Sequence, residues 1–167
     1  MEIEVSNRQK TLSLDTEKVR LVVETLLEKE GVRSDEISIL FVEEEEIAQL
    51  HDRFFGDPSP TDCITLPIDP EDDGGYRHLG EVIISPRAAL RYVEEQGGDP
   101  HEETLLYLVH GLLHLLGYED IEEEAIERMR HKEKEWLAYL QHKNLEVKPA
   151  TQPTSTQALE KKSLRKS

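Results

Sequence analysis

The sequence has little of several features that would point to particular classes of protein. Its 167 residues include a single cysteine, Cys63, which excludes an intramolecular disulfide framework and fits a reducing compartment. No apolar run approaches the ~20 residues that a membrane-spanning helix requires. The first five residues, Met-Glu-Ile-Glu-Val, lack the basic and apolar regions of a cleaved signal peptide. We therefore predict a cytoplasmic protein that does not enter a membrane.

Positive charge is also scarce. The chain carries 20 Lys and Arg against 36 Asp and Glu, a formal net charge of -16. This balance opposes the binding of a phosphate backbone by charge alone. The length and the 37% hydrophobic content suit one domain with its own core.

The composition changes after Glu146. Residues 147–167 are rich in Pro, Thr, Ser, Gln and Lys and have almost no apolar period. This composition predicts a domain over residues 1–146 followed by a disordered basic tail over residues 147–167. Such a tail could tether the protein to an acidic partner, or it could be solvated without a partner.

Apolar residues alternate in some segments and recur every three or four residues in others, which predicts strands and helices in one chain. Strands are expected around residues 3–5, 37–41, 63–66 and 79–84, and helices are expected to begin at residues 15, 43–46, 85–86, 99–100 and 121. We predict an α+β fold with a single domain, in which a small mixed sheet of about four strands packs with helices. The order of the strands cannot be read from the sequence.

The helix that begins at Asp99-Pro100 carries the most informative residues. It is apolar around much of its circumference, which predicts a central, buried position, and it is expected to end near Leu116, before Gly117. His110 and His114 lie four residues apart, so their imidazoles project from one face and can converge on one ion. The sequence therefore predicts a divalent-metal site at the C-terminal end of a central helix, with zinc as the leading candidate.

Asp120 is the predicted third ligand, because a reversal at Gly117 would bring it back over the helix end. The pattern His-x3-His-x2-Gly-x2-Asp resembles the metal segment of metzincin-like proteases, but Gly111 stands where those proteases have their general base, Glu. Two alternatives to a metal site remain open. The histidines could be core or surface residues, and Asp120 with Glu123 could form a capping box for the last helix, a role that is compatible with metal binding.

Three motifs, in order and in register, resemble the YbeY-type endoribonuclease and rRNA maturation factor family over roughly residues 1–142. They are His110-Gly-Leu-Leu-His-Leu-Leu-Gly-Tyr-Glu-Asp120, Thr61-Asp-Cys-Ile-Thr-Leu-Pro67 and Leu79-Gly-Glu-Val-Ile-Ile-Ser85. The resemblance implies a Zn²⁺ ion and cleavage of single-stranded RNA in rRNA maturation and ribosome quality control. Ribosomal RNA or the ribosome is the implied partner.

Two residues depart from the family pattern. Asp120 replaces a third histidine, which makes another divalent metal such as manganese more plausible. Phe55 replaces an arginine that is functionally important in the family, and a phenyl ring cannot replace a charged guanidinium. Arg53 is the nearest substitute, although residues two apart on a helix point in different directions. Activity is therefore expected to be reduced.

Other residues of the motifs are candidate catalytic or supporting groups. Thr61 and Asp62 could contact the site or organise their loop, and Glu81 could hydrogen-bond a metal-ligating histidine. Two other functions remain open, namely a ribosome-associated binding factor with a structural metal and a metal-dependent hydrolase of another substrate. A closed site with four ligands would favour the first, and a carboxylate base beside an open metal position would favour the second.

Overall fold

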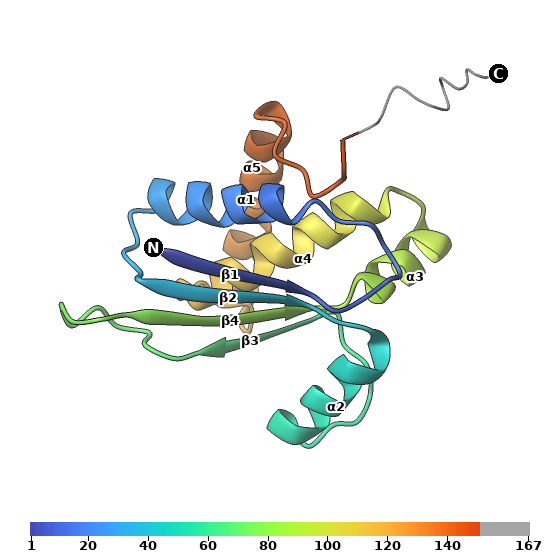
Figure 1. The fold of residues 1–167 in the computed structure, drawn as a ribbon, viewed down its shortest axis with the longest axis horizontal. Coiled ribbons are helices and arrows are strands. Elements are labelled where there is room, and N and C mark those ends of the chain that lie inside the picture. Colours follow the sequence, from blue (N-terminus) through green and yellow to red (C-terminus); the bar gives the residue numbers. More distant parts are fainter. Residues whose placement is uncertain (151–167) are drawn as a thin grey trace.

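A four-stranded mixed sheet organises residues 1–150, the part of the chain that the computed structural model describes (Figure 1). The strand order is β1-β2-β4-β3, in which β1, β2 and β4 run parallel and β3 is antiparallel to β4. The strands are β1 (Glu2–Asn7), β2 (Glu36–Phe41), β3 (Cys63–Pro67) and β4 (His78–Ile84). The predicted α+β class with a small mixed sheet is confirmed.

Most of the helices cover one face of this sheet (Figure 1). Helices α1 (Thr16–Lys29), α3 (Pro86–Gln96), α4 (Pro100–Leu115) and α5 (Glu123–His142) lie on that side, and α2 (Glu44–Phe55) lies on the other. Alternation along β4 explains the two layers: Val82 and Ile84 enter the main core, whereas Ile83 packs with Ile47 of α2. The sheet is therefore apolar on both faces.

Helix α4 is the central helix, as predicted, and its end positions the candidate site. The Asp99 carboxylate caps its start by accepting a hydrogen bond from the His101 amide at 2.8 Å. At the other end, the amides of Gly117 and Tyr118 donate to the carbonyl oxygens of His114 and Leu113 at 3.0 and 3.1 Å. This Schellman motif requires a positive φ at Gly117, which is +101°. It reverses the chain and brings residues 118–120 back beside α4.

The predicted capping role of Asp120 is wrong. Helix α5 begins at Glu123, two residues later than expected, and its N-cap is Glu122, whose side chain makes no capping hydrogen bond. The start of α5 thus relies on its acidic first turn. The Asp120 carboxylate is left free for other contacts.

The ordered domain continues past the predicted boundary at Glu146. Val147 is completely buried in the main core, and its carbonyl oxygen accepts a hydrogen bond from the Asp15 amide at 2.8 Å. This contact attaches the segment after α5 to the start of α1. The disordered tail was predicted over residues 147–167, and of these, residues 151–167 lie outside the described part of the chain. Within residues 1–150, no helix is long and apolar enough to cross a membrane.

Candidate metal centre

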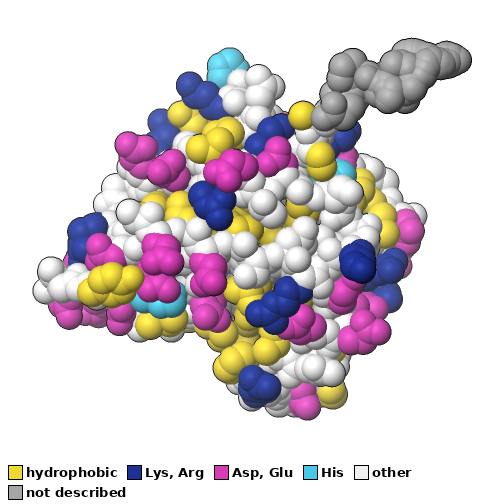
Figure 2. All heavy atoms as spheres, in the orientation of Figure 1, with side chains coloured by type: hydrophobic (Ala, Val, Ile, Leu, Met, Phe, Trp, Pro, Cys, Tyr) yellow, Lys and Arg dark blue, Asp and Glu magenta, His cyan; other side chains and the backbone are white. Residues whose placement is uncertain are grey.

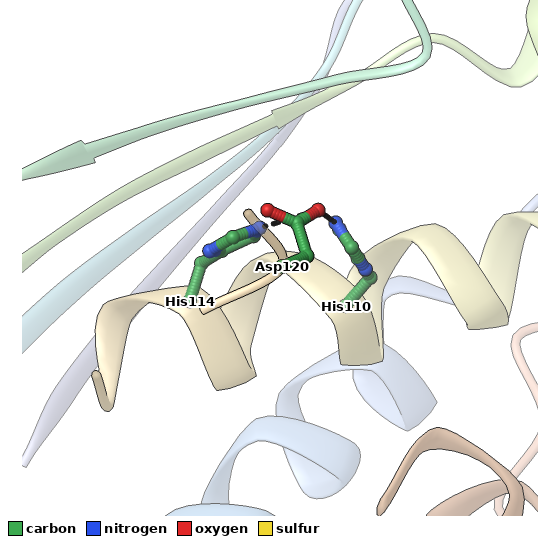
Figure 3. Close-up of side chains that lie close together, drawn as sticks. All are labelled: His110, His114 and Asp120. Atoms are coloured by element: carbon green, nitrogen blue, oxygen red, sulfur yellow. Dashed lines mark ion pairs between the residues drawn. The ribbon is translucent and has the colours of Figure 1, made fainter. Parts of the chain in front are cut away.

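His110, His114 and Asp120, the three predicted ligands, come together at the end of α4 (Figure 3). One ligand atom from each lies within 4.8 Å of the other two. The Oδ2 atom of Asp120 is 3.7 Å from Nε2 of His110 and 3.4 Å from Nε2 of His114. Both imidazoles therefore point their Nε2 atoms toward the same carboxylate oxygen.

This donor set fits a zinc ion. Zinc binds nitrogen and oxygen at about 2.0–2.2 Å, which places neighbouring ligands of a tetrahedral ion about 3.3–3.5 Å apart. The 3.4 Å distance from Asp120 to His114 lies in that range, the 3.7 Å distance to His110 is slightly longer, and the three ligand atoms all lie within 4.8 Å of one another.

Glu133 of α5 orients one of the two imidazoles. Its carboxylate accepts a hydrogen bond from Nδ1 of His110, so the Nε2 atom is the one left for a ligand. This hydrogen bond raises the pKa of His110, against the opposite effect of burial. Only 13% of the Glu133 side chain is exposed, so the carboxylate is held in a largely dry environment.

A cavity of about 300 Å³ opens beside the triad. It is lined by residues of α2, β3, α4 and the loops next to them: His51, Phe55, Asp62, Cys63, Ile64, Thr65, His110, His114 and Asp120. None of these lining residues is Lys or Arg. Burial raises the pKa of the Cys63 thiol, so it stays protonated and is a poor metal ligand.

Of the four predicted catalytic residues, one lines this cavity. Asp62 lines it with an exposed carboxylate, and Thr61 lines a neighbouring pocket instead. Arg53 is exposed on α2 and Glu81 is half-buried in β4, and neither lines the cavity. The contact to a histidine that was expected of Glu81 is made by Glu133.

Two site residues were missed in the sequence. Glu133 lies 23 residues after His110 on a different helix, so no local pattern connects them. His51 lines the cavity from α2, four residues before Phe55. Its spacing to Phe55 was the available signal, because residues four apart on a helix share a face.

Gly111 packs directly against the sheet. A Cβ atom at this position would lie 2.6 Å from Cγ1 of Val82 and 3.0 Å from Sγ of Cys63. This side of α4 therefore has no room for a glutamate. The general base that metzincin-like proteases carry after their first histidine is excluded here by packing as well as by sequence.

Fold and site together define a small α+β protein with a candidate His/His/Asp metal centre beside an open cavity. The sequence profile of the family described as Endoribonuclease YbeY matches residues 4–141. The chain belongs to this family.

Individual relatives agree with this assignment. An endoribonuclease YbeY of Chlamydia pneumoniae is 46% identical over 148 residues, covering 86% of this chain and 94% of the relative. One from Protochlamydia amoebophila is 39% identical over 146 residues, covering 87% and 97%. A solution structure from Thermotoga maritima, 24% identical, has the same fold with a TM-score of 0.57 and covers 90% of this chain and 99% of its own.

Proposed function

We propose that this protein is a metal-dependent endoribonuclease that cuts single-stranded RNA in rRNA maturation and ribosome quality control, in the cytoplasm. The observation that carries the proposal is the convergence of His110, His114 and Asp120 beside a cavity, in a chain of the endoribonuclease YbeY family. Ribosomal RNA, free or in the ribosome, is the proposed partner. The relatives are named endoribonucleases, which supports RNA as the substrate.

The proposed resident metal is Zn²⁺, with manganese or another divalent ion as the alternative because Asp120 is a hard oxygen ligand. A bound ion would supply a Lewis acid and the positive charge that the phosphate needs. Residues of the chain would set the geometry and the charge of the metal site. Glu133 fixes the ring of His110, and Asp120 adds a negative charge.

Asp62 is the proposed proton acceptor. Its carboxylate is exposed on the wall of the cavity that the triad lines, where it could take a proton from the attacking group.

The protein offers little positive charge to the RNA. Acidic side chains predominate over basic ones on the face drawn in Figure 2, in line with the net charge. We expect slow turnover, because no Lys or Arg among the described lining residues helps to neutralise the phosphate.

The geometry favours catalysis over a purely structural metal. Structural zinc sites are closed by four protein ligands, whereas catalytic sites have three and an open position. The group found among residues 1–150 has three members and lies next to a cavity. A peptidase is disfavoured because the position of Gly111 has no room for the glutamate that acts as general base in metzincin-like proteases. A hydrolase of another substrate stays the second candidate, because Asp62 could act as its base.

The test is metal analysis combined with RNA cleavage on the same preparations. We expect the wild-type protein to hold about one zinc per chain and to cut single-stranded RNA, and His110→Ala and Asp120→Ala to lose both properties. His131→Ala is the matched control, since His131 is a largely exposed histidine of α5 whose one ion pair within residues 1–150 is with Glu135. Wild-type cleavage that survives in His110→Ala, or metal-replete protein that leaves RNA intact, would refute the proposal.

Arg53, Thr61 and Glu81 stay predictions with separate tests. Each is replaced by alanine, and the rate of RNA cleavage is compared with that of Asp62→Ala. We expect Asp62→Ala to lose the most cleavage activity of the four variants, because Asp62 is the one of these residues that lines the cavity. Cleavage at the wild-type rate in Arg53→Ala would remove Arg53 from the mechanism.

A further inference from the structure

An exposed aromatic ring stands on the wall of the candidate active site. Phe55 is the last residue of α2, its accessible surface is 59% exposed, and it lines the same cavity as the metal triad. The preceding residue, Phe54, is also exposed at 46% but does not line this cavity. Two neighbouring phenylalanines thus have similar exposure and different relationships to the site.

The surroundings of Phe55 are ordered by short-range contacts. Nδ1 of His51 donates to the carbonyl oxygen of Ser59 at 2.8 Å, and the His51 ring lies 5.7 Å from the Phe55 ring, tilted by 60°. The Asp57 carboxylate accepts hydrogen bonds from the amide and hydroxyl groups of Ser59 at 3.0 and 2.6 Å. The loop after α2 is therefore tied back to the helix, and His51 supports the position of the Phe55 ring.

The chemistry of this wall suits a nucleobase better than a phosphate. Among its described lining residues the cavity has no Lys or Arg to bind a phosphate. Besides the imidazoles of the two candidate ligands, its walls carry two flat rings, the phenyl of Phe55 and the imidazole of His51. Unpaired bases stack on such rings, and a base within a duplex has no free face to offer. The wall thus matches single-stranded RNA.

We propose that Phe55 and His51 form a nucleobase subsite that stacks one unpaired base of the RNA next to the metal triad. Phe55 provides the stacking face and His51 positions it. The proposal rests on the proposed function, because it names how the same site recognises its substrate. It also assigns a binding role to the position at which the sequence departs from the family arginine.

The first experiment measures the binding of a fluorescently labelled six-nucleotide single-stranded oligoadenylate by anisotropy. We expect Phe55→Leu to raise the Kd about 5- to 150-fold, the range of one lost base stack. Phe55→Tyr keeps the ring and stays within about twofold of the wild type. Phe54→Leu, the matched control on the same helix end, also stays within about twofold. Because Phe55 is exposed, its replacement leaves the fold intact, which a thermal melt verifies.

The second experiment asks whether Phe55 acts through a base. An abasic nucleotide is placed at each position of the oligonucleotide in turn. In the wild type one position weakens binding as much as Phe55→Leu does, and in Phe55→Leu that same position has no further effect. His51→Ala gives a smaller loss at this one position, because the Phe55 ring remains but is held less firmly. A purely structural role of either residue would show no such dependence on one base.

The outcomes separate this proposal from the proposed function. Wild-type protein that neither binds nor cuts RNA would overturn both. Wild-type protein that cuts RNA, with Phe55→Leu indistinguishable from Phe54→Leu, would overturn the subsite alone. That second result is also the one expected if the exposed ring contacts a protein partner.

Discussion

Glu133 of α5 accepts a hydrogen bond from Nδ1 of His110 on α4. This contact connects the last helix of the domain to the candidate metal centre, although α5 contributes no predicted ligand. It fixes the ring orientation of His110 and leaves Nε2 directed at Asp120. The affinity of the centre for a metal is therefore expected to depend on a residue outside the motif.

The first prediction follows from this contact. Glu133→Ala is expected to lower zinc affinity about 10- to 100-fold, the usual effect of losing a hydrogen bond to a metal-ligating histidine. Glu133→Gln, whose amide oxygen can still accept the hydrogen bond, keeps more of the affinity. Competition with a chromophoric chelator measures the difference, with Glu127→Ala, an exposed glutamate of the same helix, as control. Equal affinities of the Glu133 and Glu127 variants would contradict this role.

The second prediction concerns the ligand that departs from the family pattern. Asp120→His replaces a carboxylate oxygen by an imidazole nitrogen and removes one negative charge, so we expect a stronger preference for zinc over manganese. Loading the wild type and the variant from an equimolar mixture of the two metals, followed by elemental analysis, measures this preference. Asp120→Ala serves as the variant with no third ligand. An unchanged metal ratio in Asp120→His would show that Asp120 does not bind the ion.

The third prediction concerns the close approach of α4 to the sheet. Gly111→Ala favours the helix through its propensity but places Cβ 2.6 Å from Val82, whose branched side chain cannot turn away easily. We expect the free energy of unfolding to fall by about 1–3 kcal/mol. Denaturant unfolding measures the change. The double variant Gly111→Ala/Val82→Ala removes the shortest of the close contacts, the one to Val82. Gly111→Ala is therefore expected to cost less in the Val82→Ala background than in the wild type.

The fourth prediction is a pH dependence of stability that originates at Glu30. Burial raises the pKa of Glu30, but hydrogen bonds from Lys132 and Trp136, both at 2.9 Å, outweigh it and hold the pKa below its ordinary value of 4.5. A carboxyl with a lowered folded-state pKa stabilises the protein fully above its unfolded-state pKa. This stabilisation is lost as the pH falls through the folded-state value.

The measurement compares Glu30→Gln with the wild type by denaturant unfolding at several pH values. At pH 7 we expect the variant to be about 1–3 kcal/mol less stable, because a charged hydrogen-bond acceptor is lost. Below about pH 4.5 the wild type loses this advantage and the two curves approach each other. Glu24→Gln, at an exposed position of α1, is the control and keeps a constant offset. Parallel curves for Glu30→Gln would refute the assignment.

Local patterns were sufficient to predict the elements and the three candidate ligands. The apolar period of α4 and the spacing of its two histidines are properties of one helix, and Gly117 marks the turn that returns Asp120. The strand order β1-β2-β4-β3 was not predictable, because the pairing of β2 with β4 joins segments separated by α2 and β3. Pairing of this kind depends on packing across the whole domain.

The errors have physical reasons. Asp120 and Glu123 have the spacing of a capping box, but α5 starts after Glu122, and the Asp120 carboxylate faces two imidazoles instead. Val147 belongs to a polar segment by composition, yet a single apolar side chain is enough to fill a place in the core. Composition averages over a window, and burial is decided residue by residue.

Because the chain reverses at Gly117, the three candidate ligands do not all lie on the same kind of structure. Two of its candidate ligands belong to a helix fixed in the core, and the third lies on the short connection between α4 and α5, with its side chain 42% exposed. If an ion binds at this centre, we therefore expect its loss to free this connection without opening the core. Exchange of one ion for another would then proceed in the native state, and the apoprotein would be a folded protein ready to be reloaded.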